Sequence, residues 1–452
     1  MQYASILTIL ALCFVRPYLA TGSPTAHSQH LSSPPSSPTE SQTNISLSLF
    51  AELEELSRVV DISYCVGTTG ISHPFICASR CDDFPSFELV DTFNTGPLMS
   101  DSCGYIALDH STKRVGRGRI VVAFRGTYSL ANTIVDLSTV PQEYIPYPGD
   151  PSDEKGKNPK KAKKGKKSLW DWIPGHSLWG SVIYEPNCYM TKDAPPIPKV
   201  KCDNCTVHSG FWISWQNTRP RVLPHLRKLR ERFPDYRLDL VGHSLGGAVA
   251  ALAGLEFEGL GWNPYITTFG EPKIGNSGLR NFVDRTFHLP SEHIVETATE
   301  KLYSGRYRRI THVDDPVPLL PLQEWGYRSH AGEIHISKSE LQPTLADLRL
   351  CYGDEDLECI AGGDVDNSWF GTANNFAVYE NKNSLTAEEE MLAKRWGISL
   401  PARFKIWQLL FAHRDYFWRL GLCVPGGDPL DWGRGRYDFG DGDGDGEWKE
   451  EL

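Results

Sequence analysis

The sequence predicts an α/β fold in which a mostly parallel β-sheet carries helices on both faces. Short apolar runs rich in β-branched residues alternate with longer helix-like runs, and this alternation is typical of strand–helix–strand units. One glycine-rich turn joins an apolar strand directly to an alanine-rich helix over 238–257. A chain of 452 residues with 40% apolar content and 13 Trp is also ample for a buried core.

The predicted elements follow one another in a regular order. A first helix is expected from near Ser46, because apolar residues recur on one face at Leu49, Leu53, Leu56, Val60 and Ile62. A second is expected over 209–233, broken by Pro220 and Pro224, and a third over 245–258. The strands are expected at RGRIVVAFRG (117–126), YRLDLVG (236–242), YITTFG (265–270), RYRRITHV (306–313) and GEIHI (332–336).

The amino-terminal segment predicts export. Residues 1–22 are expected to be a secretory signal peptide, because ASILTILALCFV (4–15) is apolar but too short to span a bilayer. Residues 23–45 are rich in Ser and Pro and have little to bury, so a disordered arm is expected there. A single ordered domain then covers 46–437. We expect a secreted protein without a transmembrane segment.

Two segments depart from the strand and helix pattern. Residues at about 149–201 are rich in Lys and Pro and are predicted to be an insertion, either a solvated loop, a patch that attracts anionic lipid surfaces or a site for a dibasic-directed protease. Residues 438–452 form an acidic, Gly-rich tail. Its Asp residues copy half of an EF-hand loop, but the twelfth position falls on Leu452 instead of a bidentate Glu, so no metal is expected.

Charge and cysteine content narrow the partners and the compartment. The net charge is −10, and subtracting the eight lysines of 155–167 leaves −18, which argues against nucleic acid as a partner. Of the 11 cysteines one, Cys13, belongs to the leader; the remaining even number suits disulfides in an oxidising compartment. The sequons at Asn44 and Asn204 are expected glycosylation sites in a secreted chain.

The stretch DLVGHSLGGAV (239–249) predicts a nucleophile. Ser244 lies between Gly242 and Gly246, after an apolar strand and before a helix, which is the context of a nucleophile elbow. The glycines permit a sharp turn that exposes the serine oxygen. The Leu245 amide, at the helix start, then faces the place where a carbonyl oxygen gains charge. The plainer alternative is a glycine-rich turn with a hydrogen-bonded serine.

A serine nucleophile requires a histidine base, and the base requires a carboxylate that orients it. The carboxylate is expected in RRITHVDDPVPLLP, where Asp314 and Asp315 follow a strand. The residues alone do not separate these two. Among the later histidines, His335 falls within a strand, while His330 and His413 are equal candidates for the base.

Several stretches together resemble the fungal class 3 lipases, and especially the secreted yeast triacylglycerol lipases. They run from ISYCVG at residue 62 to YFWRLGLC at residue 423 and include FRGTYSL, CDNCTVHSGF, GHSLGGA, FGEPKIGN, RITHVDDPVP and AHRDYF. The resemblance implies an α/β-hydrolase fold. It implies the nucleophile at Ser244, the acid at Asp315 and the base at His413, in a His-x-x-Tyr-Phe motif that favours His413 over His330.

The same resemblance implies the rest of an esterase site. Thr127, after the Arg-Gly of FRGT, is expected to complete an oxyanion hole with the Leu245 amide, unless it is a plain strand-end residue. Residues 128–144 are expected to form a helical lid, unless they rest on the core as an ordinary amphipathic helix. Its apolar side carries Leu130, Ile134 and Leu137, and Thr133 stands where several fungal relatives have Trp.

The resemblance also implies four disulfide bonds. The pairs are Cys77 with Cys81, Cys202 with Cys205, Cys351 with Cys359 and Cys65 with Cys423. Cys103 and Cys188 are left over, and we predict that they pair and fasten the insertion to the domain.

These observations predict a secreted, monomeric lipase that hydrolyses the carboxylic esters of triacylglycerols at an oil–water interface. The expected mechanism passes through an acyl-enzyme on Ser244 and uses no metal or cofactor. A phospholipase or a feruloyl or other carboxylesterase of the same fold is the first alternative. The second, from another class, is a lipid-binding homologue without turnover, against which the complete set of candidate residues argues.

Overall fold

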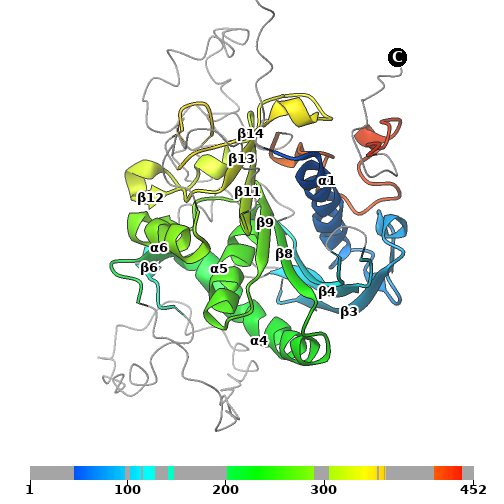
Figure 1. Ribbon diagram of the computed structural model, residues 1–452, viewed down its shortest axis with the longest axis horizontal. Coiled ribbons are helices and arrows are strands. Elements are labelled where there is room, and N and C mark those ends of the chain that lie inside the picture. The colour runs from blue at the N-terminus through cyan, green and yellow to red at the C-terminus, as the bar shows by residue number, and fades with distance from the viewer. Residues whose placement is uncertain are drawn as a thin grey trace, which may run out of the picture. The chain divides into compact units, whose positions relative to one another are not determined.

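An eight-stranded β-sheet forms the centre of the computed structural model, which describes residues 45–96, 102–112, 116–127, 141–146, 201–289, 305–353, 356–360, 362 and 412–439 (Figure 1). Its order is β14-β13-β11-β9-β8-β5-β4-β3. Neighbours from β5 to β13 are parallel and the outer pairs antiparallel, so the predicted mostly parallel sheet is confirmed. The strands are β3 (Phe87–Asn94), β4 (Cys103–Asp109), β5 (Arg119–Phe124), β8 (Arg237–His243), β9 (Tyr265–Phe269), β11 (Tyr307–His312), β13 (Glu333–Ile336) and β14 (Leu348–Leu350).

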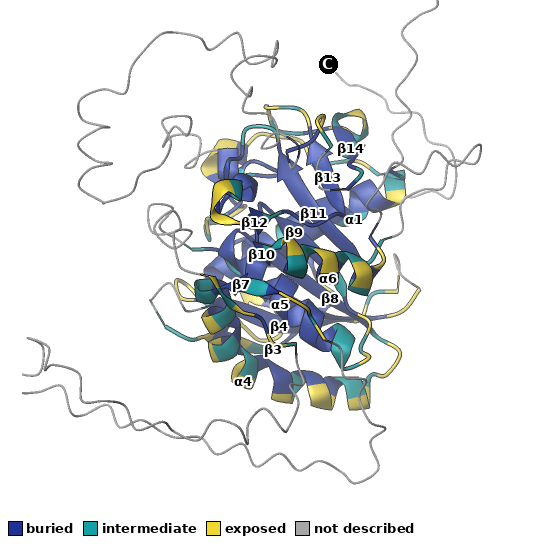
Figure 2. Ribbon diagram, turned by 90° about the vertical axis from the view of Figure 1, so that its left-hand side faces the viewer, coloured by how far each residue is buried: buried dark blue, intermediate teal, exposed yellow. Residues whose placement is uncertain are grey.

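Helices cover both faces of this sheet, as predicted (Figure 1). One face carries α1 (Leu47–Ile62); the other carries α5 (Leu245–Gly259) with α4 (Ser209–Arg232) and α6 (Ser277–Phe287). Side chains alternate between the two layers: in β5, Val122 packs into the core shared with α5, whereas Val121 packs into the core shared with α1. The central strands are therefore buried throughout, as Figure 2 shows.

Shorter elements complete the described fold. A four-stranded antiparallel sheet has the order β12-β10-β7-β6, and β1 pairs with β2. None of these strands was predicted. Their bounds are β1 (Ile71–Ser72), β2 (Ile76–Cys77), β6 (Pro141–Glu143), β7 (Thr206–His208), β10 (Gly275–Asn276) and β12 (Tyr327–Arg328). The 3-10 turns are η1 (Ser63–Cys65), η2 (Cys81–Asp83), η4 (Val317–Leu319), η5 (Gln323–Trp325), η6 (Leu345–Asp347), η9 (Ala412–Arg414) and η10 (Pro429–Asp431).

The predicted break in helix α4 was wrong, because the helix runs unbroken through Pro220 and Pro224. The two prolines lie four residues apart on the exposed side of the helix. On that side water is available to the carbonyls that lose their N–H partners. On the opposite side Trp215 and Leu226 are fully buried in the core. This burial holds the helix together across both prolines.

The part of the chain that the structure describes contains four disulfide bonds, and they are the four pairs that the resemblance implies. Cys65 and Cys423 are 358 residues apart, so their bond joins the end of α1 to the terminal segment that carries His413. Closing so long a loop is worth about 6 kcal/mol in the chain-entropy account. Cys351 and Cys359 lie near Glu333 in an arrangement that resembles a metal site, but the two sulfurs are bonded to each other and cannot ligate.

Several predictions concern residues outside the described ranges. These are the leader, almost all of the Ser/Pro-rich arm, the lid helix, the lysine-rich insertion with Cys188, and most of the acidic tail. Of the predicted lid stretch, only its last residues are described, in and after β6. The domain boundaries and the Cys103–Cys188 pair stay predictions.

Asp61, at the end of α1, gives the stability a predictable pH dependence. Burial raises its pKa to about 6 from an ordinary 3.8, although the Gly421 N–H and the charge of Arg80 favour the ionised form. Because the folded-state pKa is the higher one, this stabilising contribution is complete below the unfolded pKa and is lost as the pH rises to about 6. In the wild type we expect the unfolding free energy to fall by roughly 1–3 kcal/mol, for this group alone, as the pH rises from the ordinary pKa of 3.8 to about 6. In Asp61→Asn this fall should be absent. Urea denaturation of both proteins at acidic and neutral pH measures this; identical pH profiles would contradict it.

Candidate active site

The predicted site residues gather at one edge of the central sheet. Strands β5, β8 and β11 run in the same direction, so their carboxyl ends lie at this edge. Thr127 comes shortly after β5, Ser244 directly after β8 and Asp315 shortly after β11. His413 arrives from the terminal segment, in η9. The carboxyl edge is where open α/β sheets bind their ligands.

Ser244 lies in a strained turn between β8 and α5. Its φ of 57° and ψ of −130° are unusual for a residue with a side chain. A Cβ on Gly242 would lie 2.2 Å from the Gly246 carbonyl oxygen, and one on Gly246 would lie 2.3 Å from the Phe124 carbonyl oxygen, so only glycine fits at either place. The Ser244 N–H donates to the Phe269 carbonyl at 2.9 Å, which fixes the turn to β9. This is the geometry of a nucleophile elbow.

Asp315 and His413 are in direct contact. Nδ1 of His413 lies 3.0 Å from Oδ1 and 2.9 Å from Oδ2 of the carboxylate. The Tyr416 hydroxyl and the Val317 N–H also donate to it. Burial by itself raises the pKa of Asp315, but the charge of His413 and these hydrogen bonds outweigh burial, so the pKa lies below its ordinary value. The ionised carboxylate keeps the proton of the ring on Nδ1 and leaves Nε2 as its basic nitrogen.

The other candidates are engaged elsewhere. His330 places Nε2 3.2 Å from Glu271 Oε1 and Nδ1 2.7 Å from the Ala331 carbonyl oxygen, so both of its nitrogens are used away from Asp315. His335 is buried in β13 with Nδ1 3.0 Å from the Thr311 hydroxyl. Asp314 is only half-buried, whereas Asp315 is fully buried beneath His413.

Three buried polar atoms of the predicted site have no hydrogen-bond partner among the described residues: Ser244 Oγ, His413 Nε2 and Thr127 Oγ1. A Cβ on Gly126, next to Thr127, would lie 2.8 Å from Ser244 Cβ, so these two segments touch. Buried polar atoms are normally paired, so three orphans around one elbow indicate a site that receives the polar groups of a ligand. Oγ and Nε2 do not bond each other in this structure, as is common before substrate binds.

Gly270 lies under this site and supplies a sharp test of its packing. Its φ is +61°, and a Cβ there would lie 2.8 Å from both Asp315 Oδ2 and His413 Cε1. Gly261 has a similar φ of +75° but open space around it. Both alanine variants should lose about 1 kcal/mol of stability through backbone strain. Only Gly270→Ala should also lower kcat, by roughly 100-fold, because it displaces the His413 ring. Steady-state kinetics of the two variants at matched folded fractions decide; equal kcat values would contradict the packing described.

The site also contains residues that the sequence analysis did not single out. The His243 ring, next to Ser244, stacks on the His413 ring with centroids 4.7 Å apart. Tyr64 contacts His243 across 179 residues of sequence. Tyr416 belongs to the His-x-x-Tyr-Phe motif and Tyr64 to the ISYCVG stretch, both of which carry the resemblance, but neither residue was given a role.

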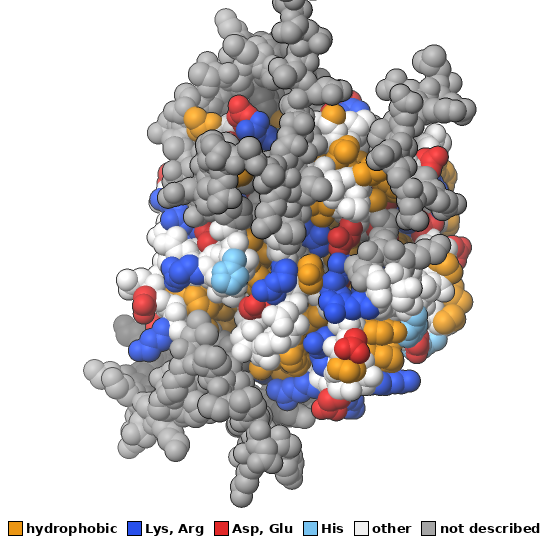
Figure 3. All heavy atoms as spheres, in the orientation of Figure 1, with side chains coloured by type: hydrophobic (Ala, Val, Ile, Leu, Met, Phe, Trp, Pro, Cys, Tyr) orange, Lys and Arg blue, Asp and Glu red, His pale blue; other side chains and the backbone are white. Residues whose placement is uncertain are grey.

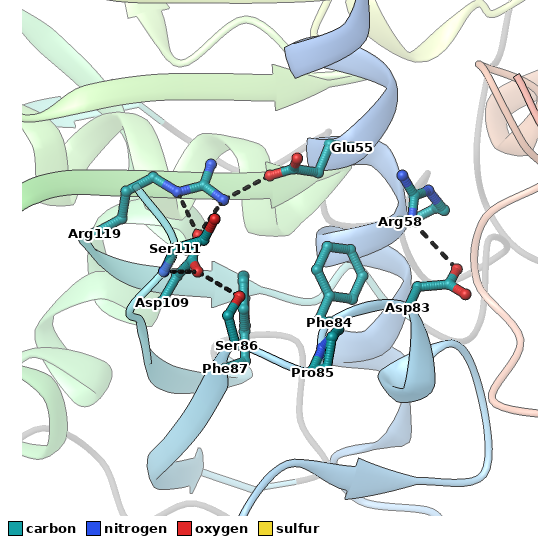
Figure 4. Close-up of a pocket in the computed structure, with 10 residues that line it drawn as sticks. All are labelled: Glu55, Arg58, Asp83, Phe84, Pro85, Ser86, Phe87, Asp109, Ser111 and Arg119. Atoms are coloured by element: carbon teal, nitrogen blue, oxygen red, sulfur yellow. Dashed lines mark hydrogen bonds and ion pairs between the residues drawn. The ribbon is translucent and has the colours of Figure 1, made fainter. Parts of the chain in front are cut away.

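A separate cavity of about 350 Å³ lies between α1 and the β4–β5 hairpin (Figure 4). Half of its lining residues are charged, and these pair with one another: Arg119 contacts Glu55 and Asp109, and Arg58 contacts Asp83. The rest of the lining is uncharged and comes mainly from the 84–87 segment. It contains none of the predicted site residues.

The fold and the site together define an α/β-hydrolase, because a mostly parallel sheet carries a nucleophile elbow after a central strand and a histidine is paired with a carboxylate. In its chemistry this class is a serine ester hydrolase. The chain belongs to the class 3 lipases. The family described as lipase (class 3) matches residues 121–325. The secreted mono- and diacylglycerol lipase 2 of Gibberella zeae is 52% identical over 444 residues, which cover 96% of this chain and 95% of that protein. Lipase A of Sodiomyces alcalophilus is 47% identical over 402 residues, 86% of each chain.

A solved structure agrees with the fold. The crystal structure of the Lip2 lipase from Yarrowia lipolytica is 26% identical, covers 84% of this chain and 97% of its own, and has a TM-score of 0.57. The Gibberella protein is named as secreted, in agreement with the expected secretion of this chain. Within the described residues, no helix is both long and apolar enough to cross a membrane. The protein is a secreted lipase.

Proposed function

We propose that Ser244 is the nucleophile, His413 the general base, Asp315 the orienting acid, and Thr127 with the Leu245 amide the oxyanion hole. The observation that carries this assignment is the paired contact of Asp315 with Nδ1 of a buried His413 whose Nε2 is unbonded. It is supported by the orphaned hydroxyls of Ser244 and Thr127.

In the first half-reaction, Nε2 of His413 takes the proton of Ser244 as Oγ attacks the ester carbonyl. The Leu245 amide, at the start of α5, and Thr127 donate to the oxyanion that forms. His413 then gives its proton to the leaving alcohol, and an acyl-enzyme remains. In the second half-reaction the same nitrogen deprotonates a water molecule that attacks the acyl carbon, and the proton returns to Ser244 Oγ as the bond to the fatty acid breaks. None of these steps calls for a metal or a cofactor.

The substrates that we propose are acylglycerols, presented at an oil–water interface to a monomeric enzyme. The resemblance implies triacylglycerols, and the 52% identical relative from Gibberella zeae is named a mono- and diacylglycerol lipase. All of these substrates are fatty acid esters of glycerol.

A substrate series tests this class. The purified protein should act fastest on one of emulsified tri-, di- or monoacylglycerol, and at least about tenfold more slowly on phosphatidylcholine and on a feruloyl ester. A preference for the phospholipid or the soluble aromatic ester would replace the proposed substrate with the corresponding alternative. An alkylphosphonate should label the protein once, on the peptide that contains Ser244. Labelling of another peptide would overturn the assignment of the nucleophile.

A further inference from the structure

Tyr64 and His243 lie in contact beneath the site and take no part in the proposed chemistry. Tyr64 belongs to η1, beside the disulfide-bonded Cys65, and His243 ends β8 directly before Ser244. Both side chains are buried. The Tyr64 hydroxyl lies 2.5 Å from Nδ1 of His243, and Nε2 of His243 lies 2.8 Å from the backbone carbonyl oxygen of His413.

These two contacts determine which nitrogen of His243 carries the proton. A carbonyl oxygen only accepts, so Nε2 of His243 must donate to His413. In a neutral ring Nδ1 is then the acceptor, and the Tyr64 hydroxyl is its donor. Burial and, after it, the neighbouring charge of His413 lower the pKa of His243 to about 3, so the ring is neutral at the pH at which a lipase works.

The Tyr64 oxygen has a second role, because it also packs against the backbone of Gly126. A Cβ on Gly126 would lie 2.5 Å from this oxygen, which shows how close the two groups are. One hydroxyl therefore joins the loop of Thr127 to the residue before Ser244. The same hydroxyl is linked to His413 through the His243 ring. That ring donates to the His413 backbone carbonyl and stacks on the His413 imidazole with centroids 4.7 Å apart.

We propose that Tyr64 and His243 form a positioning pair, which fixes the His413 ring and the Thr127 loop relative to Ser244. The proposal rests on the proposed function of these three residues. The parts that it joins come from separate segments of the chain, so no local structure can align them. A neutral His243 also suits the chemistry, because a charged ring stacked on His413 would oppose the imidazolium that forms during acylation.

Tyr64→Phe tests the pair, with Tyr105→Phe as its matched control. Tyr105 is equally buried, and its hydroxyl donates to the Val59 carbonyl at 2.8 Å, away from the site. We expect Tyr64→Phe to lower kcat roughly 10- to 100-fold with KM within about twofold, and to slow phosphonate inactivation equally. Tyr105→Phe should keep kcat within about threefold of wild type. Equal kcat and inactivation rates in the two folded variants would overturn the proposal.

Substitutions of His243 add a second, independent readout. His243→Gln keeps a donor for the His413 carbonyl, whereas His243→Leu keeps none, so Gln should retain more of kcat than Leu. If the two residues act as one unit, the loss of kcat in Tyr64→Phe combined with His243→Leu should be clearly smaller than the product of the two single losses. Fully multiplicative losses would contradict the pair. Ser244→Ala in the same assays separates the two claims. If Ser244→Ala is inactive but Tyr64→Phe has normal kcat, only the positioning role is contradicted. If Ser244→Ala is fully active, the proposed function itself is contradicted.

Discussion

Replacing Ser244 by alanine is expected to lower kcat for ester hydrolysis by roughly 10⁵-fold. Without Oγ no acyl-enzyme can form, and what remains is the contribution of binding and of the oxyanion donors. Ser244 Oγ bonds no described residue, so removing it breaks no hydrogen bond there. The fold should therefore be unaffected. Initial rates on emulsified acylglycerol and on a soluble short-chain ester measure the effect.

Ser214 in α4 offers the matched control for this variant. It is also a buried serine whose Oγ has no hydrogen-bond partner among the described residues, but it lies in the helix layer instead of the elbow. Ser214→Ala should keep activity within about threefold of wild type. If Ser244→Ala retained activity comparable to Ser214→Ala, the nucleophile would have to be another residue.

The second large effect is expected for Asp315→Asn, which should lower kcat by roughly 10⁴-fold. The amide matches the carboxylate in shape, but it favours the wrong proton position on the His413 ring and removes the charge that stabilises the imidazolium. The Val317 N–H can still donate to the amide oxygen at the place of Oδ1, and the Tyr416 hydroxyl at the place of Oδ2 can turn to accept from the amide NH2. The loss should therefore lie in kcat and much less in stability.

Asp314→Asn is the control for this substitution, one residue away. Its side chain is half-buried, its backbone N–H donates to Nδ1 of His312, and the carboxylate that meets His413 is that of Asp315. We expect kcat within about threefold of wild type. Steady-state kinetics and thermal unfolding of both variants are needed together; a larger loss of kcat in Asp314→Asn than in Asp315→Asn would show that the carboxylates are wrongly assigned.

The central sheet could be predicted because its parallel strands are buried on both faces and read as continuous apolar runs, as RIVVAF does. The outer strand FELVDTFN alternates buried and exposed side chains and carries charges, so it has a weaker signal. The two- and three-residue strands of the smaller sheet are too short for any period. The prolines of α4 were misjudged because their cost depends on the side of the helix that faces solvent, which is a property of the packed molecule.

In the site, the elbow is local and its prediction needed only the glycines around Ser244. The choice between His330 and His413 is not local, because it depends on which carboxylate each ring meets. His330 contacts Glu271, 59 residues away in the sequence, and His413 contacts Asp315, 98 residues away. No spacing rule carries that information, and the motif resemblance alone favoured His413. Tyr64 shows the same limit at 179 residues from His243.

The convergence of Ser244, His413 and Thr127 is tested most directly by a crystal structure of the protein inactivated with an alkylphosphonate. Phosphorus should be bonded to Ser244 Oγ, with Nε2 of His413 within about 3 Å of an ester or Oγ oxygen. The phosphoryl oxygen should accept hydrogen bonds from Thr127 and the Leu245 N–H. An adduct on another residue, or a His413 ring out of hydrogen-bond reach of the adduct, would contradict the proposed site.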